Sequence, residues 1–173
     1  SSDLESGHAV VALHSPASDP IHKATIIPRG RALGMVMRLP ETDRISHSKE
    51  KLMADLAVAA GGRLAEEMIF GEEKITTGAS SDIKMVTDMA RRMVTEWGMS
   101  EKLGTVNYDP RRRNRFLDLG LPTERGPYSE ETARLIDEEV KAIIAAAHDD
   151  ARRILRDHRD ILERVTRRSE EHT

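Results

Sequence analysis

A long helical pattern, capped by Ser46 or Ser48, runs to about Phe70, and it strongly constrains how the chain can fold. Apolar residues recur there at every fourth position, which is typical of a helix that buries one face. These residues are Leu52, Leu56, Ala60, Leu64 and Met68. The pattern runs through Gly61-Gly62, although each glycine costs a helix roughly 1 kcal/mol relative to alanine. We therefore expect another element to pack closely against this helix at the two glycines.

Composition narrows the class of protein. The 173 residues suit one domain, or one domain with a helical appendage. Aromatic residues make up only 3% of the chain, so the core must be aliphatic. There is no cysteine, which leaves His, Asp and Glu as the only strong metal ligands. The formal net charge of −3 gives no general attraction to nucleic acid.

Two further helical regions are predicted after residue 71. One covers residues 82–97, with a face formed by Ile83, Val86, Ala90, Met93, Val94 and Trp97. The other covers residues 129–168, where Ser129 caps the first helix and a break near Asp157 separates it from a second. Residues 110–128 between these regions are rich in Arg, Gly and Pro, and we expect a mobile loop there.

The first forty residues predict a short helix followed by a hairpin. The helix covers residues 4–13, and the β-branched stretches 23–28 and 33–39 are expected to pair as strands. Since the chain opens in the middle of a helical pattern, we expect it to be a fragment of a longer polypeptide. No apolar run approaches the roughly 18 residues of a membrane span. The predicted fold class is mainly α, with one small β-hairpin.

The first helix carries part of a metal-binding motif. In the zinc-peptidase motif H-E-x-x-H, two histidines one turn apart bind zinc and the glutamate activates a water. Glu5 and His8 stand at the spacing of the glutamate and the second histidine. Leu4 occupies the position of the first histidine, and it cannot bind a metal. The alternative is a surface glutamate and a partly buried histidine on an amphipathic helix.

Five stretches together carry a family resemblance. They are E-S-G-H (5–8), H-K-A-T-I-I-P-R-G-R-A-L-G (22–34), G-G-R-L-A-E-E-M-I-F-G (61–71), T-T-G-A-S-S-D-I (76–83) and E-T-A-R-L-I-D-E-E-V (131–140). Residues 1–173 as a whole resemble the peptidase domain of the FtsH-type, membrane-anchored AAA+ zinc proteases. The second and fourth stretches are long and specific to that family. The resemblance implies a zinc metallopeptidase domain that hydrolyses peptide bonds.

The resemblance also implies the residues of the site. It assigns His8 and Asp82 as zinc ligands and Glu5 as the general base, with Leu4 in the place of the remaining ligand. Asp82 falls at the start of a predicted helix, where the helix dipole keeps a carboxylate ionised. The alternative for Asp82 is an ordinary helix-start aspartate. Because a catalytic zinc takes three protein ligands, we expect weak or absent zinc and little proteolysis. A natural loss and a designed substitution at Leu4 would look the same.

Two other regions have both a functional and a plain interpretation. By resemblance, Thr25, Ile26 and Ile27 belong to an edge strand that pairs with an extended substrate, and the plain alternative is a structural hairpin. Glu66 and Glu67 are expected to be solvated, the alternative being that one of them supports the metal site. The arginines of residues 111–115 are expected to lie on a surface loop rather than bind phosphate.

The predicted function follows from the resemblance. It is the endopeptidase domain of an ATP-dependent, membrane-anchored protease that degrades unfolded and membrane proteins in protein quality control, impaired here by Leu4. The family implies a homo-hexamer at the cytoplasmic face of a bacterial inner membrane, or its organelle equivalent. ATP would be used by a separate domain, because the chain has no P-loop motif. The alternative is a non-catalytic ring-assembly module that binds no zinc, and a nucleic-acid-binding module is disfavoured.

Overall fold

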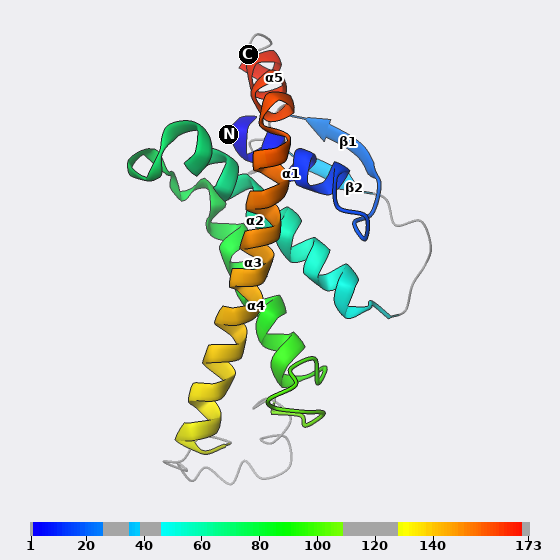
Figure 1. Ribbon diagram of the computed structural model, residues 1–173, viewed down its shortest axis with the longest axis vertical. Coiled ribbons are helices and arrows are strands. Elements are labelled where there is room, and N and C mark those ends of the chain that lie inside the picture. Colours follow the sequence, from blue (N-terminus) through cyan, green and yellow to red (C-terminus); the bar gives the residue numbers. More distant parts are fainter. Residues whose placement is uncertain (1, 26–34, 39–45, 109–127, 171–173) are drawn as a thin grey trace, which may run out of the picture. The chain divides into compact units, whose positions relative to one another are not determined.

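The computed structural model describes residues 2–25, 35–38, 46–108 and 128–170, and these are mainly helical (Figure 1). The predicted fold class is confirmed, and one two-stranded antiparallel sheet accompanies the helices. The chain divides into two compact units. The first comprises Ser1–Val86 with Ala145–Thr173, and the second comprises Thr87–Ile144.

The first unit is built around helix α2, Lys49–Phe70. Its start is set by Ser48, whose side-chain oxygen accepts a hydrogen bond from the Lys51 amide at 3.2 Å. Its end is set by Gly71, which has φ of 84°, a conformation that glycine adopts without strain. Both boundaries agree with the prediction, because both are signalled by residues next to the helix end.

Helix α1, Ser2–Leu13, crosses α2 at its two glycines. A Cβ atom on Gly7 would collide with the carbonyl oxygen of Gly61, so the two backbones touch. A Cβ atom on Gly61 would lie 2.8 Å from Cγ2 of Val11. The prediction that another element packs closely against Gly61-Gly62 is confirmed, and that element is α1.

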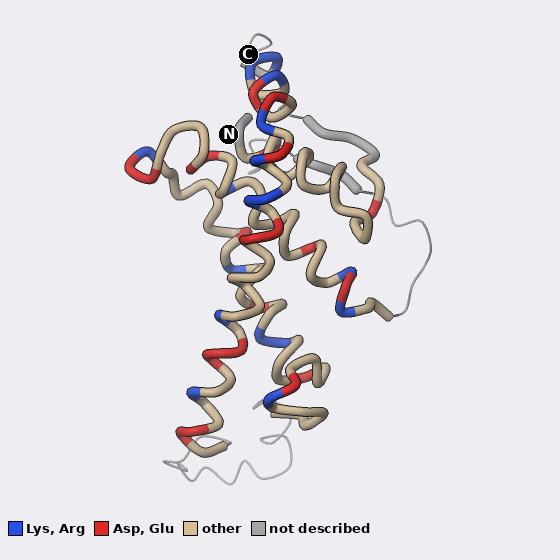
Figure 2. Tube along the Cα trace, viewed as in Figure 1, with Lys and Arg blue, Asp and Glu red and all other residues tan. Residues whose placement is uncertain are grey.

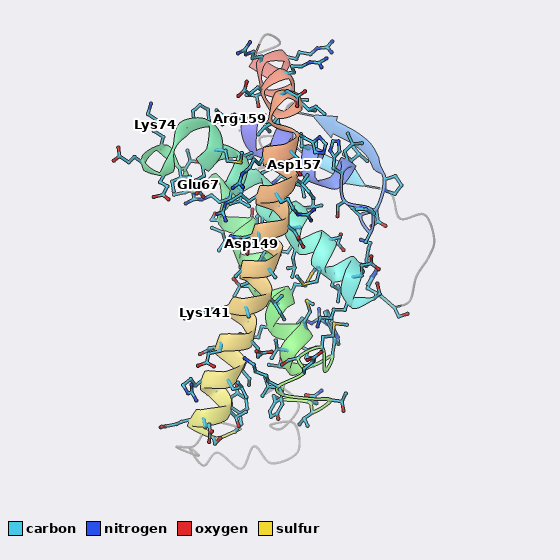
Figure 3. All side chains as sticks on the ribbon, viewed as in Figure 1. Glu67, Lys74, Lys141, Asp149, Asp157 and Arg159 are labelled. Carbon is cyan, nitrogen blue, oxygen red and sulfur yellow. The ribbon has the colours of Figure 1, made fainter. Side chains whose placement is uncertain are left out.

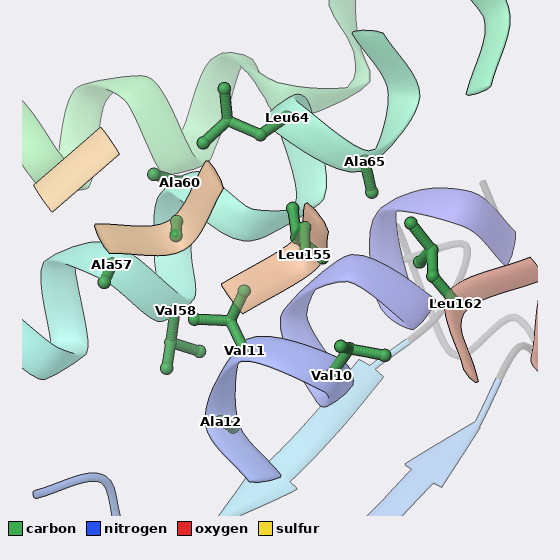
Figure 4. Close-up of a cluster of buried hydrophobic side chains, with 11 residues drawn as sticks. Val10, Val11, Ala12, Ala57, Val58, Ala60, Leu64, Ala65, Leu155 and Leu162 are labelled. Atoms are coloured by element: carbon green, nitrogen blue, oxygen red, sulfur yellow. The ribbon is translucent and has the colours of Figure 1, made fainter. Parts of the chain in front are cut away.

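The core of the first unit joins α1 and α2 to the C-terminal helices (Figure 4). It contains Val10, Val11, Ala12, Ala57, Val58, Ala60, Leu64, Ala65, Ala151, Leu155 and Leu162. Burying each of the larger side chains stabilises the unit by about 1.5–3 kcal/mol. As expected from composition, this core is aliphatic.

The predicted break in the C-terminal region is also confirmed. Helix α4 is Glu130–Asp157 and helix α5 is Arg159–Glu170. His158 lies between them, and its ring stacks on that of His14 with the ring centroids 3.5 Å apart. The stack therefore ties the end of α1 to the junction of the last two helices.

Asp149 and Asp157 lie about two turns apart on the exposed side of α4 (Figure 3).

Charged residues of both signs follow one another along α4 and α5 (Figure 2). Several form ion pairs within one helix, such as Arg153 with Asp150 at 3.1 Å and Arg159 with Glu163 at 2.9 Å. Exposed pairs of this kind contribute about 0.3–0.5 kcal/mol each. Over the described residues, no helix is both long and apolar enough to cross a bilayer.

The predicted hairpin is present, with its strands displaced. Strand β1 is Ile21–Thr25 and strand β2 is Met35–Arg38, and they pair antiparallel with Thr25 opposite Met35. The first strand begins two residues earlier than predicted, and the register is irregular between Ile21 and Lys23. The predicted extension to residue 28 lies outside the described residues.

The second unit has its own small core, formed between the later part of helix α3, Ser80–Thr95, and the first part of α4. Its buried residues are Ala90, Val94, Leu103, Ile136 and Val140. Ser129 caps α4 by accepting a hydrogen bond from the Thr132 amide at 3.2 Å, as predicted. The proposed mobile loop falls almost entirely in residues 109–127, which lie outside the described residues.

The prediction that Ile83 and Trp97 belong to the buried apolar face of α3 is wrong. Ile83 is 54% exposed, although it lies on the same side of the helix as the buried Ala90 seven residues later. Trp97 lies beyond the end of the helix and is 38% exposed, with the guanidinium of Arg92 over its ring at 4.6 Å.

Candidate active site

The structure brings together two predicted metal ligands that are far apart in sequence. His8 lies in the second turn of α1, and Asp82 lies in the first turn of α3. The Nε2 atom of His8 is 3.4 Å from Oδ2 of Asp82. Their side chains are only 14% and 27% exposed, respectively. Both residues belong to the first compact unit.

The other ring nitrogen of His8 is held by α2. Its Nδ1 atom lies 2.8 Å from the carbonyl oxygen of Val58. Because a carbonyl oxygen only accepts hydrogen bonds, Nδ1 must carry the proton in this contact. The Nε2 edge is thereby directed at Asp82. A backbone partner of this kind sets which nitrogen is offered to a ligand.

The charges around His8 shift its ionisation. Burial is the largest single influence and lowers the pKa of His8. The hydrogen bonds with Asp82 and Val58 and the negative charges of Asp82 and Glu5 raise the pKa, and together they outweigh burial. The pKa of His8 therefore lies above its ordinary value. The pKa of Glu5 is also raised, mainly by burial and in part by the charge of Asp82, although His8 opposes the shift. Glu5, His8 and Asp82 thus form one interacting group.

Leu4 places an apolar side chain near Gly78, in the segment before Asp82. Its Cδ1 atom lies 2.8 Å from the point where a Cβ on Gly78 would stand, so it packs on the turn that leads to Asp82. Nothing in a leucine side chain can donate electrons to a metal ion. The described residues contain no set of three His, Asp or Glu side chains placed to hold a metal. The donor set therefore does not fit a catalytic zinc, which needs three protein ligands.

A buried glutamate supports the Asp82 side of the site, and the prediction that Glu66 is solvated is wrong. Glu66 is 5% exposed. Its carboxylate accepts hydrogen bonds from the Thr76 amide at 3.2 Å and the Thr76 hydroxyl at 2.7 Å. Arg63 donates to the Thr76 carbonyl oxygen at 3.2 Å. The segment that leads to Asp82 is thereby attached to α2.

Spacing along α2 could have distinguished Glu66 from Glu67. Val58, Gly62 and Glu66 are four residues apart, so they share one face of the helix. Val58 bonds His8, and a Cβ on Gly62 would meet the His8 ring. Glu66 lies on the same face and therefore turns toward the site, whereas Glu67 is rotated away and is only half-buried.

The predicted substrate strand is only partly described. Thr25 is the last residue of β1, and Ile26 and Ile27 lie outside the described residues. The hydrogen bonds of β1 to β2 involve one edge of this strand. Its pairing with a substrate remains a prediction.

Comparison with known proteins gives consistent matches. Residues 4–169 match the sequence model of Peptidase family M41. The chain is 57% identical over 158 residues to the ATP-dependent zinc metalloprotease FtsH of Rickettsia bellii, covering 91% of this chain and 24% of that protein. The protein of the same name from Caulobacter vibrioides is also 57% identical, with 91% and 25% covered. That from Photobacterium profundum is 50% identical, with 91% and 23% covered. The chain spans about a quarter of the length of these relatives.

Proposed function

Because the chain belongs to peptidase family M41, we propose that it is the peptidase domain of an ATP-dependent zinc metalloprotease whose hydrolytic activity is impaired by Leu4. Relatives that share half or more of its residues carry the name zinc metalloprotease, so the chain is a metalloendopeptidase domain by family. The observation that supports the impairment is the incomplete donor set. His8 and Asp82 face each other at 3.4 Å, and Leu4, at the position of the first histidine of the motif, has no donor atom in its side chain.

When one ligand is missing, His8 and Asp82 interact with each other. His8 and Asp82 lie in contact and the pKa of His8 is raised, so a proton competes with a metal for the donors of this pair. A metal ion would have to displace the proton from His8 and separate the pair, gaining only two protein ligands in return. The site therefore favours the ion pair. In the family a bound zinc would polarise the peptide carbonyl and activate water, and this chain supplies Glu5 but not the full ligand set for that chemistry.

The test restores the missing ligand with Leu4→His and measures bound zinc and casein hydrolysis beside the unchanged chain. We expect about one zinc per chain and casein cleavage only in the restored protein. Leu13→His is the matched control, because Leu13 lies on the same helix but is 66% exposed and away from the site. Zinc and cleavage in the unchanged chain would show that another residue replaces Leu4, and would overturn the proposal.

Leu4 itself supports a second candidate function, that of a non-catalytic ring-assembly module that binds no zinc. The first unit keeps an intact aliphatic core although its ligand set, over the described residues, is incomplete. Under this alternative, Leu4→His would bind no zinc and cleave nothing, while the chain would still associate with copies of itself. The metal content of the restored chain separates the two functions.

The remaining proposals concern the whole protein, of which the chain is about a quarter by comparison with its relatives. We propose a membrane-anchored homo-hexamer at the cytoplasmic face of a bacterial inner membrane, with ATP used by a separate domain. Its substrates would be unfolded and membrane proteins, and residues Thr25, Ile26 and Ile27 would pair with them as an added strand. The name ATP-dependent zinc metalloprotease of the relatives supports this assignment.

A further inference from the structure

We propose that Gly62 is a positioning residue for His8. Its bare Cα lets the imidazole lie against α2, so that Nδ1 bonds the Val58 carbonyl while Nε2 faces Asp82. The proposal deepens the proposed function, since it rests on that function for the reason why the direction of Nε2 matters. Its test requires neither metal nor proteolysis.

The first argument is steric. A Cβ atom on Gly62 would stand 2.6 Å from both Cε1 and Nε2 of His8. Carbon and nitrogen atoms that are not bonded do not approach this closely, so the ring would have to move. The two atoms belong to the ring edge that faces Asp82. Any side chain at position 62 therefore acts on the part of His8 that the site uses.

The second argument is that the ring has no free direction in which to move. Its Nδ1 atom is 2.8 Å from the Val58 oxygen, and its Nε2 atom is 3.4 Å from Oδ2 of Asp82. A shift away from α2 lengthens the first contact, and a rotation about the Cβ–Cγ bond changes the second. An alanine at position 62 is therefore expected to break at least one of these two contacts.

The adjacent glycine has a different role and provides a control. A Cβ on Gly61 would meet Cγ2 of Val11 at 2.8 Å and the carbonyl oxygen of Gly7 at 2.9 Å. Those atoms form the crossing of α1 and α2 and do not include His8. Gly61 thus permits the close approach of the helices, and Gly62 accommodates the imidazole.

A cycle of variants separates the two roles without any metal. We expect Gly62→Ala to lower the melting temperature of the unchanged chain by several degrees, because the added methyl group collides with the His8 ring. In a His8→Ala background the collision is gone, although the Leu4 carbonyl oxygen would still be 3.1 Å from the new Cβ. There Gly62→Ala should leave Tm unchanged or raise it by up to about 4 °C, since alanine favours a helix over glycine. Gly61→Ala should lower Tm in both backgrounds.

The tautomer of His8 gives a second readout that needs no stability difference. Imidazole 15N shifts of the zinc-free chain, recorded where the ring is neutral, should show the proton on Nδ1 of His8. In Gly62→Ala, if the variant folds, the proton should move toward Nε2 because the Val58 contact is weakened.

Two results would overturn the proposal. One is an equal change in Tm from Gly62→Ala with and without His8. The other is a proton on Nε2 of His8 in the unchanged chain, which can be observed even if every variant fails to fold. If the cycle behaves as expected but Leu4→His binds no zinc, the proposed function fails and the role of Gly62 stands.

Discussion

Helix α1 carries His8, and His14 follows directly after its last residue, Leu13; the surroundings of the two histidines differ. His8 is held from two sides by other elements, with Val58 of α2 on one ring nitrogen and Asp82 of α3 on the other. His14, at the end of the same helix, bonds the carbonyl oxygen of Val10 one turn earlier at 2.9 Å and stacks on His158. His8 thus has polar partners on separate elements, whereas His14 is bonded by its own helix.

His8 and His14, only six residues apart, therefore have different roles: His8 is oriented for chemistry, and His14 is structural. The partners of His8 each direct a particular nitrogen, so its ring has a chemical orientation. The contacts of His14 close the end of α1 against the junction of α4 and α5, and its ring faces another ring. Orientation by two polar partners, rather than the presence of histidine, distinguishes the candidate site.

Replacing each histidine with alanine should give the largest difference between the two regions. His8→Ala removes the contact of Nδ1 with the Val58 carbonyl oxygen and the contact of Nε2 with Asp82. We expect it to lower the free energy of unfolding by about 2–3 kcal/mol. His14→Ala removes a bond within one helix and a stacked ring, and should lower it by about 1 kcal/mol or less. Denaturant unfolding of the two variants measures the difference, and equal losses would contradict the comparison.

Removing the support behind Asp82 should have a smaller effect that is confined to the His8 side. Glu66→Ala deletes the acceptor of two hydrogen bonds from Thr76, but Thr76 is exposed and can bond water instead. We expect a loss of about 1–2 kcal/mol in the free energy of unfolding. The imidazole signals of His8 should shift because Asp82 is less well held, while those of His14 stay in place.

The control for this variant is Glu72→Ala. Glu72 lies in the short 3-10 helix Glu72–Lys74 that follows α2, and its side chain is exposed. Its removal is expected to change stability by no more than about 0.5 kcal/mol. If Glu66→Ala behaves in the same way, the anchoring of the Asp82 segment by Glu66 does not matter for stability.

Signals within a few residues made the helix ends predictable, whereas contacts between residues farther apart in the sequence could not be predicted. Ser48, Gly71 and Ser129 mark helix ends through contacts within a few residues, so their roles could be inferred from sequence. The spacing of Glu5 and His8 identified half of the site in the same way. The spacing of Glu66 from Val58 and Gly62 indicates the face of α2 on which it lies, but its hydrogen bonds depend on where the following turn places Thr76, which no local pattern encodes.

The roles of Val58 and Gly62 were hidden for two other reasons. Val58 acts through its backbone carbonyl, which leaves no trace in the residue type. Gly62 belongs to a glycine pair whose close packing was predicted, but its own neighbour is a side chain rather than a helix backbone.

The dependence of stability on pH should show the smallest effect of the group formed by Glu5, His8 and Asp82. The pKa of His8 is raised in the folded chain, so its contribution is fully present below the pKa of the unfolded chain. That contribution is lost as the pH rises through the higher pKa of the folded state. The raised pKa of Glu5 acts in the same direction, because folding favours its protonated form and stability falls as it ionises. The contribution of these two residues should therefore decline from mildly acidic toward alkaline pH, whereas the lowered pKa of His148 acts in the opposite direction.

Variants that remove one member of the group should flatten this decline in the window set by His8. His8→Gln cannot be protonated there, and Asp82→Asn removes the charge and the hydrogen bond that raise the pKa of His8. Denaturant unfolding at a series of pH values from about 5 to 9 measures the slopes, which report the protons taken up on folding. If His8→Gln keeps the full slope of the unchanged chain, the His8–Asp82 pair is not the origin of the pH dependence. His8 and His14 would then differ only in the geometry of their contacts.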